Sequence, residues 1–134
     1  MELGGKDPLI ITQSADMDAA TDLALRSTVL ATGQACQSIE RVYVPAGIYE
    51  DFVQKLAAKA KAVRLNTPDI SKGEMGPFIF GAQAPKVKAQ IDAAVKDGAR
   101  LLVRDADRAR DLQAQARVLG AHRRGREAEL LVDD

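Results

Sequence analysis

Residues 39–65, IERVYVPAGIYEDFVQKLAAKAKAVRL, decide the fold that we expect for this chain. Ile39 to Val44 is rich in β-branched and aromatic residues and stops at Pro45-Ala46-Gly47, which predicts a strand followed by a turn. From Ile48 to about Leu65 the apolar residues fall on one helical face, namely Ile48, Phe52, Leu56, Ala60 and Val63. The segment is therefore expected to form a strand, a turn and an amphipathic helix.

A strand and a helix are also predicted before this unit. Residues 9–11, LII, form a short apolar run between polar stretches, as a buried strand does. Ser14 or Asp16 can then cap a helix that continues to about Ala31, with Gly33 placed to end it. The loop that follows this helix contains Cys36, and we call it the cysteine loop.

The same alternation continues after residue 65. The stretch 66–83 is rich in glycine and proline and should be mostly loop. Pro85 can occupy the first turn of a helix that ends at Gly98, and Ala99 to Val103 runs on as a strand. Strands that alternate with helices predict an α/β fold, with a largely parallel sheet flanked by helices.

Composition and charge exclude several classes of protein. The chain has 134 residues, 46% hydrophobic and 28% charged, which is typical of one globular unit. Nineteen basic and nineteen acidic residues cancel, so neither nucleic acid nor an anionic membrane is expected as a partner. No apolar run approaches the roughly 18 residues of a membrane span, and residues 1–8 carry charges where a signal peptide needs an apolar core. We therefore expect a soluble cytoplasmic protein.

The use of basic residues changes after Val103. All eight lysines precede this point, whereas seven of the eleven arginines fall in residues 104–134. We divide the chain there into a segment 1–103 and an arginine-rich tail 104–134. The tail is either a polar, partly helical end or a stretch that belongs to another reading frame. His122 and its neighbouring arginines lack the interleaved aromatics of a nucleic-acid site, so we assign them no function.

Cys36 is the single cysteine, which excludes an internal disulfide framework and a multi-cysteine metal site. It follows a predicted helix and precedes a predicted strand, where a side chain can face a cleft. A lone cysteine is nevertheless more often a small buried hydrophobe than a nucleophile. A nucleophilic role needs a base nearby, because the thiolate attacks and a free thiol has a pKa of about 8.5.

Glu2 is the candidate for that base. It lies in MELGGK, residues 1–6, where Gly4-Gly5 suggests a tight backbone approach to a ligand or to another segment. The alternative is that the glycine pair is merely a turn and that Lys6 is a solvated charge.

Together the two motifs identify a family. The stretch MELGGKDP, residues 1–8, closely resembles the glutamate signature of the aldehyde dehydrogenase superfamily, and GQAC, residues 33–36, resembles its cysteine signature. Their order and separation suit that family. Three further stretches are similar to family sequence: ADMDAA (15–20), SIERVYV (38–44) and KVKAQI (86–91). The resemblance implies that residues 1–103 are an aldehyde dehydrogenase catalytic-domain segment that spans both active-site motifs.

The resemblance implies an oxidoreductase that converts a small aldehyde to a carboxylic acid, with NAD or NADP as hydride acceptor. The Cys36 thiolate would attack the aldehyde carbon to form a thiohemiacetal, and the Cys36 backbone N–H would supply half of an oxyanion hole. Glu2 would activate the water that hydrolyses the thioester. Leu3 and Gly4 would lie against the nicotinamide end of the cofactor. A homo-oligomer is implied for the intact family member, and no metal is implied.

The chain also departs from the family pattern. Leu30-Ala31-Thr32 stands where an asparagine commonly precedes the cysteine loop, and Gln37 stands where a smaller residue is usual. The cofactor-binding domain that precedes the glutamate motif in the family is absent, and so is the downstream Glu-Glu-x-Phe-Gly-Pro segment. We therefore expect a truncated or frame-shifted product with weak activity or none. The alternative is a non-catalytic family remnant, or an oligomerisation module that associates through its sheet edges.

Overall fold

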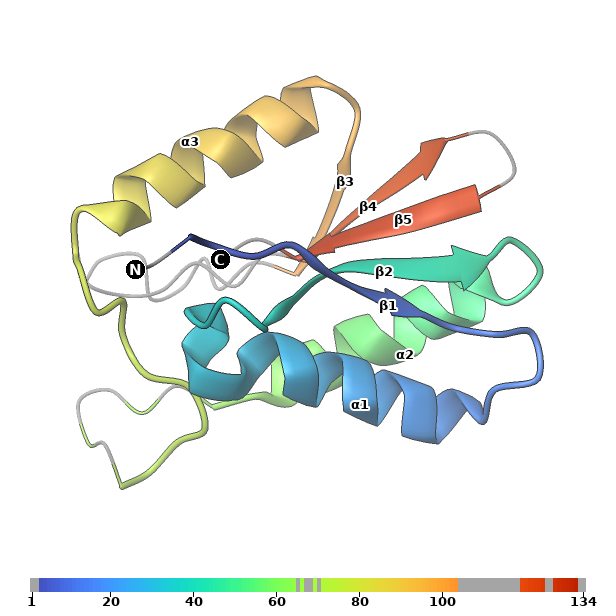
Figure 1. The fold of residues 1–134 in the computed structure, drawn as a ribbon, viewed down its shortest axis with the longest axis horizontal. Helices are drawn as coiled ribbons and strands as arrows, with labels where there is room; N and C mark the ends of the chain where they lie inside the picture. The colour runs from blue at the N-terminus through green and yellow to red at the C-terminus, as the bar shows by residue number, and fades with distance from the viewer. Residues whose placement is uncertain are drawn as a thin grey trace.

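The computed structural model describes residues 3–64, 66, 69, 71–103, 119–124 and 127–132 (Figure 1). The described elements follow in chain order: β1 (Asp7–Ile10), α1 (Met17–Val29), the 3-10 turn η1 (Leu30–Gly33), β2 (Ile39–Pro45), α2 (Tyr49–Ala62), α3 (Gln83–Lys96), β3 (Arg100–Val103), β4 (Leu119–Arg124) and β5 (Glu127–Val132). Each strand and helix that we predicted before residue 104 is present, with its ends shifted by a few residues. The strand–turn–helix unit over 39–65 is confirmed as β2 and α2.

The strands form one five-stranded sheet in the order β1-β2-β5-β4-β3. The α/β class is confirmed, but parallel pairing holds only for β1 and β2, and the other three pairs are antiparallel. The expectation of a largely parallel sheet is corrected by the two strands of the tail. Only residues 125 and 126 separate β4 from β5, and so short a connection joins antiparallel strands. Leu119, which lies in the tail that we expected to be partly helical or to belong to another reading frame, begins β4.

Helices cover both faces of the sheet. Figure 1 shows α1 and α2 together on one face and α3 on the other. The larger core lies under α1 and α2 and contains Ile11, Ala20, Ala24, Val42, Val44, Tyr49, Phe52, Val53, Leu56, Ala60 and Val103. On the opposite face Val87 and Ile91 of α3 pack against Phe78 and Leu101. This second, smaller cluster attaches α3 and the loop before it to the sheet.

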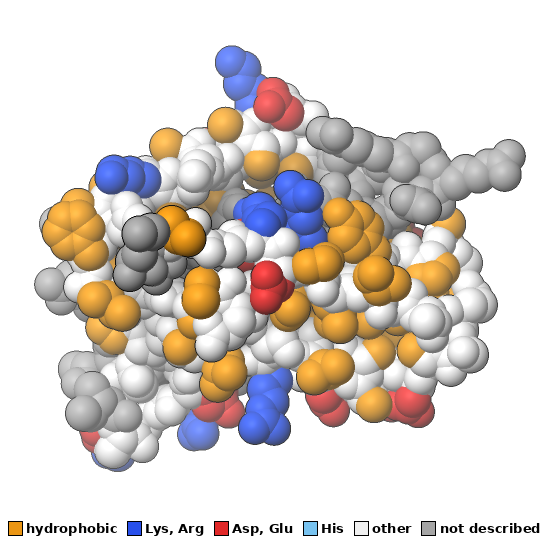
Figure 2. Space-filling view, viewed as in Figure 1, with side chains coloured by type: hydrophobic (Ala, Val, Ile, Leu, Met, Phe, Trp, Pro, Cys, Tyr) orange, Lys and Arg blue, Asp and Glu red, His pale blue; other side chains and the backbone are white. Residues whose placement is uncertain are grey.

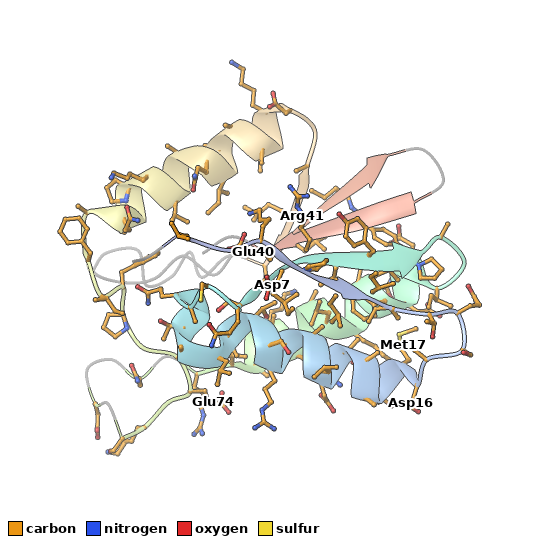
Figure 3. The ribbon with its side chains drawn as sticks, viewed as in Figure 1. Asp7, Asp16, Met17, Glu40, Arg41 and Glu74 are labelled. Carbon is orange, nitrogen blue, oxygen red and sulfur yellow. The ribbon has the colours of Figure 1, made fainter. Side chains whose placement is uncertain are left out.

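Polar contacts fix α1, the helix that leads to the cysteine loop. The Asp16 carboxylate, labelled in Figure 3, accepts a hydrogen bond from the Ala19 N–H at 2.8 Å, which confirms the predicted cap. Lys55 of α2 donates to Asp18 at 2.5 Å, and Lys59 donates to the Asp18 carbonyl at 3.0 Å. The hydrogen bond from Lys55 lowers the pKa of Asp18, and the same bond raises the pKa of Lys55. The two helices are thereby held side by side.

Candidate functional site

The cysteine loop begins in a left-handed turn. After α1, Ala31, Thr32 and Gly33 have φ angles of 50°, 61° and 75°. This region suits glycine, whereas for an L-residue with a side chain it costs about 1–2 kcal/mol. Ala31 and Thr32 fall in the Leu30-Ala31-Thr32 stretch that departs from the family pattern. Backbone strain is therefore concentrated a few residues before Cys36.

The glutamate motif packs against the cysteine loop at Gly5. A Cβ atom added to Gly5 would lie 1.8 Å from the Cys36 carbonyl oxygen and 2.7 Å from its carbonyl carbon, so only glycine fits. Gly4 needs glycine for a different reason, because its φ is 74° although an added Cβ would meet nothing within 4 Å. Of our two interpretations of the glycine pair, close approach to another segment is confirmed for Gly5. The two motifs, far apart in the chain, are neighbours in the fold.

A cavity of about 420 Å³ lies where these segments meet. It is lined by Gly4, Gly5, Gln34, Ala35, Cys36, Glu40, Phe78, Ile79, Phe80, Gln83 and Val87. The Cys36 side chain is exposed, and its thiol donates a hydrogen bond to Gln37 Oε1 at 3.0 Å. Because the thiol is open to solvent, the alternative of a buried structural cysteine is wrong for this chain. The arrangement leaves the Cys36 side chain accessible from the cavity.

Glu40 is a residue of this site that our sequence analysis did not single out. Its side chain is only 7% exposed and forms an ion pair with Lys6, which is 52% exposed. Figure 3 shows Glu40 beside the N-terminal segment that leads into β1. Glu40 shares the buried side of β2 with Val42 and Val44, and this alternation of period two is the signal that could have found it. The ion pair links the glutamate motif to β2, the strand that follows the cysteine motif.

Gln34 is the other residue that the sequence did not reveal. Its Oε1 accepts a hydrogen bond from the Ile79 N–H at 2.8 Å, and its Nε2 donates to the Pro77 carbonyl at 3.4 Å. Nε2 also donates to Thr32 Oγ1. We predicted residues 66–83 only as a loop. The structure instead ties one end of this loop to the residues beside Cys36.

The structure places some of the predicted site residues at the cavity, but not all of them. Cys36 and Gly4 line the cavity, and Leu3, next to Gly4, is 83% exposed. Glu2, the proposed base, lies outside the described residues. Within the described ranges, His, Cys, Asp and Glu side chains do not gather in a group of three that could hold a metal ion. None of the helices that the structure describes is long and apolar enough to cross a membrane.

Comparisons with known proteins show the family of the chain. The model of the aldehyde dehydrogenase family matches residues 1–119. Betaine aldehyde dehydrogenase of Cereibacter sphaeroides is 41% identical over 102 residues, which are 76% of this chain and 21% of that protein. The chain thus spans about a fifth of the length of the curated relative that it matches.

Solved structures are similar over the same region. Lactaldehyde dehydrogenase from Escherichia coli is 38% identical, with a TM-score of 0.72 over 77% of this chain and 22% of that one. Betaine aldehyde dehydrogenase from Staphylococcus aureus, solved in complex with NAD⁺, is 32% identical, with a TM-score of 0.78 over 87% of this chain and 24% of that one. Three findings lead to one conclusion. The cysteine loop packs on the glutamate-motif segment, the family model matches most of the chain, and these relatives are similar to it. The chain belongs to the aldehyde dehydrogenase family.

Proposed function

We propose that this chain supplies the catalytic cysteine segment of an NAD(P)-dependent aldehyde dehydrogenase, with Cys36 as the nucleophile. The observation that supports this most directly is the backbone contact between Gly5 and Cys36. It puts the glutamate motif and the cysteine motif on one cavity, with the thiol exposed. Family membership supplies the class of reaction, the oxidation of an aldehyde.

The chemistry follows from the position of the thiol. As a thiolate, Cys36 Sγ adds to the carbonyl carbon of a small aldehyde, and the electron pair of the C=O bond moves to oxygen to give the oxyanion of a thiohemiacetal. The Cys36 backbone N–H is the proposed donor to that oxygen. Glu2 is the proposed base that takes a proton from the water that hydrolyses the thioester. The packing of the Cys36 carbonyl on Gly5 keeps the orientation of the reacting residue fixed.

NAD or NADP is the proposed cofactor, and Leu3 and Gly4 are the residues proposed to hold its nicotinamide end. Gly4 lines the cavity and leaves open space where a side chain would project, while Leu3 is exposed beside it. Such a stretch of accessible backbone and apolar surface fits a flat aromatic ring. When bound, the cofactor supplies the acceptor for the hydride that leaves the aldehyde carbon.

Esterase chemistry tests the proposal without the cofactor. With 4-nitrophenyl acetate, the thiolate attacks the ester carbonyl, an acetyl thioester forms and 4-nitrophenolate leaves. Because Cys36 is the single cysteine, we expect a burst of up to one equivalent of 4-nitrophenolate per chain and no burst from Cys36→Ala. Glu2→Gln should keep the burst but slow the turnover that follows it. A burst that survives Cys36→Ala would exclude this cysteine as the source.

The non-catalytic alternative makes the opposite prediction. An inert family remnant should have a Cys36 thiol that is not alkylated at neutral pH, whereas a preserved site should be alkylated rapidly. Self-association of the complete enzyme stays a prediction that size-exclusion chromatography measures. The cytoplasmic location also stays a prediction.

A further inference from the structure

The side chain of Gln34 bridges two walls of the cavity. Gln34 belongs to the cysteine loop, and its amide group accepts a hydrogen bond from the Ile79 N–H and donates to the Pro77 carbonyl. Both partners are backbone groups of one short stretch. A side-chain amide that meets a backbone N–H and a backbone C=O in this way fixes the position of that stretch rather than of one side chain.

The stretch held by Gln34 carries the apolar wall of the cavity. Phe78, Ile79 and Phe80 all line the cavity together with Cys36. Phe78 is anchored against α3, but Ile79 is 87% exposed and Phe80 is 63% exposed. Figure 2 shows hydrophobic side chains on the surface beside the N-terminal end of α3. Little hydrophobic packing therefore holds the outer part of this wall. Hydrogen bonds hold its backbone instead: the Ile79 N–H donates to Gln34 Oε1, and the Phe80 carbonyl accepts from the Gln83 N–H at 2.9 Å.

We propose that Gln34 is a positioning residue that holds the apolar wall 78–80 opposite Cys36 and so gives the site a preference for aldehydes with an apolar or aromatic substituent. The inference rests on the proposed function, because it takes Cys36 as the reacting thiol. The other lining groups are consistent with it. Among the described lining residues, Glu40 is the only one with an ionisable carboxylate, and its charge is already paired with Lys6.

The preference can be measured on the 134-residue chain with two maleimides. N-phenylmaleimide and N-methylmaleimide share one reactive group and differ in the substituent that the wall would contact. The ratio of their second-order rate constants with Cys36, divided by the same ratio with glutathione, cancels both the intrinsic reactivity of the reagents and the fraction of thiolate. Partial burial of a phenyl ring against the wall predicts a corrected ratio of about 10 for the wild-type chain.

Variants of Gln34 test the role of the amide. Gln34→Met has a similar length but makes no hydrogen bond, so its corrected ratio should fall close to about 1. Gln34→Glu keeps an oxygen that accepts from the Ile79 N–H and should retain most of the preference. Gln54→Met is the matched control, because Gln54 is exposed on α2 and does not line the cavity. It should leave the ratio unchanged.

Hydrogen exchange at Ile79 gives a second measurement that needs no reaction. In the wild-type chain the Ile79 amide should be protected, and in Gln34→Met it should exchange faster. An unprotected Ile79 amide in the wild-type chain overturns the inference even if Gln34→Met does not fold. So does a corrected ratio near 1 in the wild-type chain, or one that Gln34→Met leaves unchanged. If neither maleimide labels the wild-type Cys36, the proposed function fails, and the inference fails with it.

Discussion

A methyl group at position 5 should displace Cys36, the proposed nucleophile. In Gly5→Ala the new Cβ would lie 1.8 Å from the Cys36 carbonyl oxygen and 2.7 Å from the carbonyl carbon. Ordinary contacts between a carbon and a carbonyl oxygen are about 3.3 Å or longer, so the two segments must separate by roughly 1.5 Å. The contacted carbonyl carbon and oxygen of Cys36 are backbone atoms, which cannot rotate away as the end of a side chain can.

The size of this shift sets the expected effects. Misplacement of a reacting group by about 1 Å can cost on the order of 100-fold in rate. Over-packing of this kind costs about 1–3 kcal/mol of stability, which for a domain of this size lowers Tm by roughly 5–15 °C. We therefore expect Gly5→Ala to slow the 4-nitrophenyl acetate burst by about 100-fold and to lower Tm within that range.

Two other glycines provide controls for this experiment. Gly47→Ala should be nearly neutral, because its Cβ would lie 3.6 Å from the Gln13 side chain, an ordinary contact. Gly4→Ala meets no atom within 4 Å but has a φ of 74°, so it measures the cost of backbone strain alone, about 1–2 kcal/mol. If Gly5→Ala matches Gly47→Ala in both burst rate and Tm, the packing of the two motifs is refuted.

Three further predictions concern the surroundings of the site. Ala31→Gly should raise the free energy of unfolding, measured by urea denaturation, by about 1 kcal/mol, because glycine relieves the strain of a φ of 50°. No gain in stability would show that residue 31 is not left-handed. Lys6→Met should cost about 1–3 kcal/mol because it leaves the buried Glu40 carboxylate without its ion-pair partner, and adding Glu40→Gln should recover most of the loss. Equal losses of stability in Lys6→Met and in the double variant with Glu40→Gln would contradict this role of the ion pair. Asp18→Asn removes a carboxylate whose pKa is held below 3.8 by the hydrogen bond from Lys55. Its stabilising effect is therefore present above that pH and lost as pH falls through the lowered pKa, so wild type and Asp18→Asn should differ in urea at pH 6, and the difference should shrink as the pH is lowered into the acid range.

The local elements could be predicted because their signals are local. In β2 the residues alternate between more and less buried, with Val42 and Val44 inside, as the β-branched pattern indicates. In α2 the four-residue spacing of Phe52, Leu56 and Ala60 places all three in the core. Asp16 caps α1 because a short acidic side chain can accept the N–H of Ala19. Each of these depends on neighbours within a few residues.

The pairing of strands and the walls of the cavity depend on distant residues instead. The tail strands β4 and β5 lie between β2 and β3, and local sequence does not determine this order. The Gln34 side chain meets the backbone N–H of Ile79, and a backbone contact leaves no trace in the identity of the side chain at position 79. The two-motif site itself was predictable only from the family resemblance, because no spacing rule places Gly5 against Cys36.

The outer edge of the sheet at β1 is short and carries a proline. The Ile11 N–H points inward to the Tyr43 carbonyl at 2.9 Å, so by alternation the backbone nitrogen of Pro8 faces outward. Proline has no N–H, and the exposed rim of this four-residue strand is left with few donors for an incoming chain. A strand added at this edge would meet few backbone donors with which to continue the hydrogen-bond ladder, and this protects the protein from amyloid-like stacking through the edge.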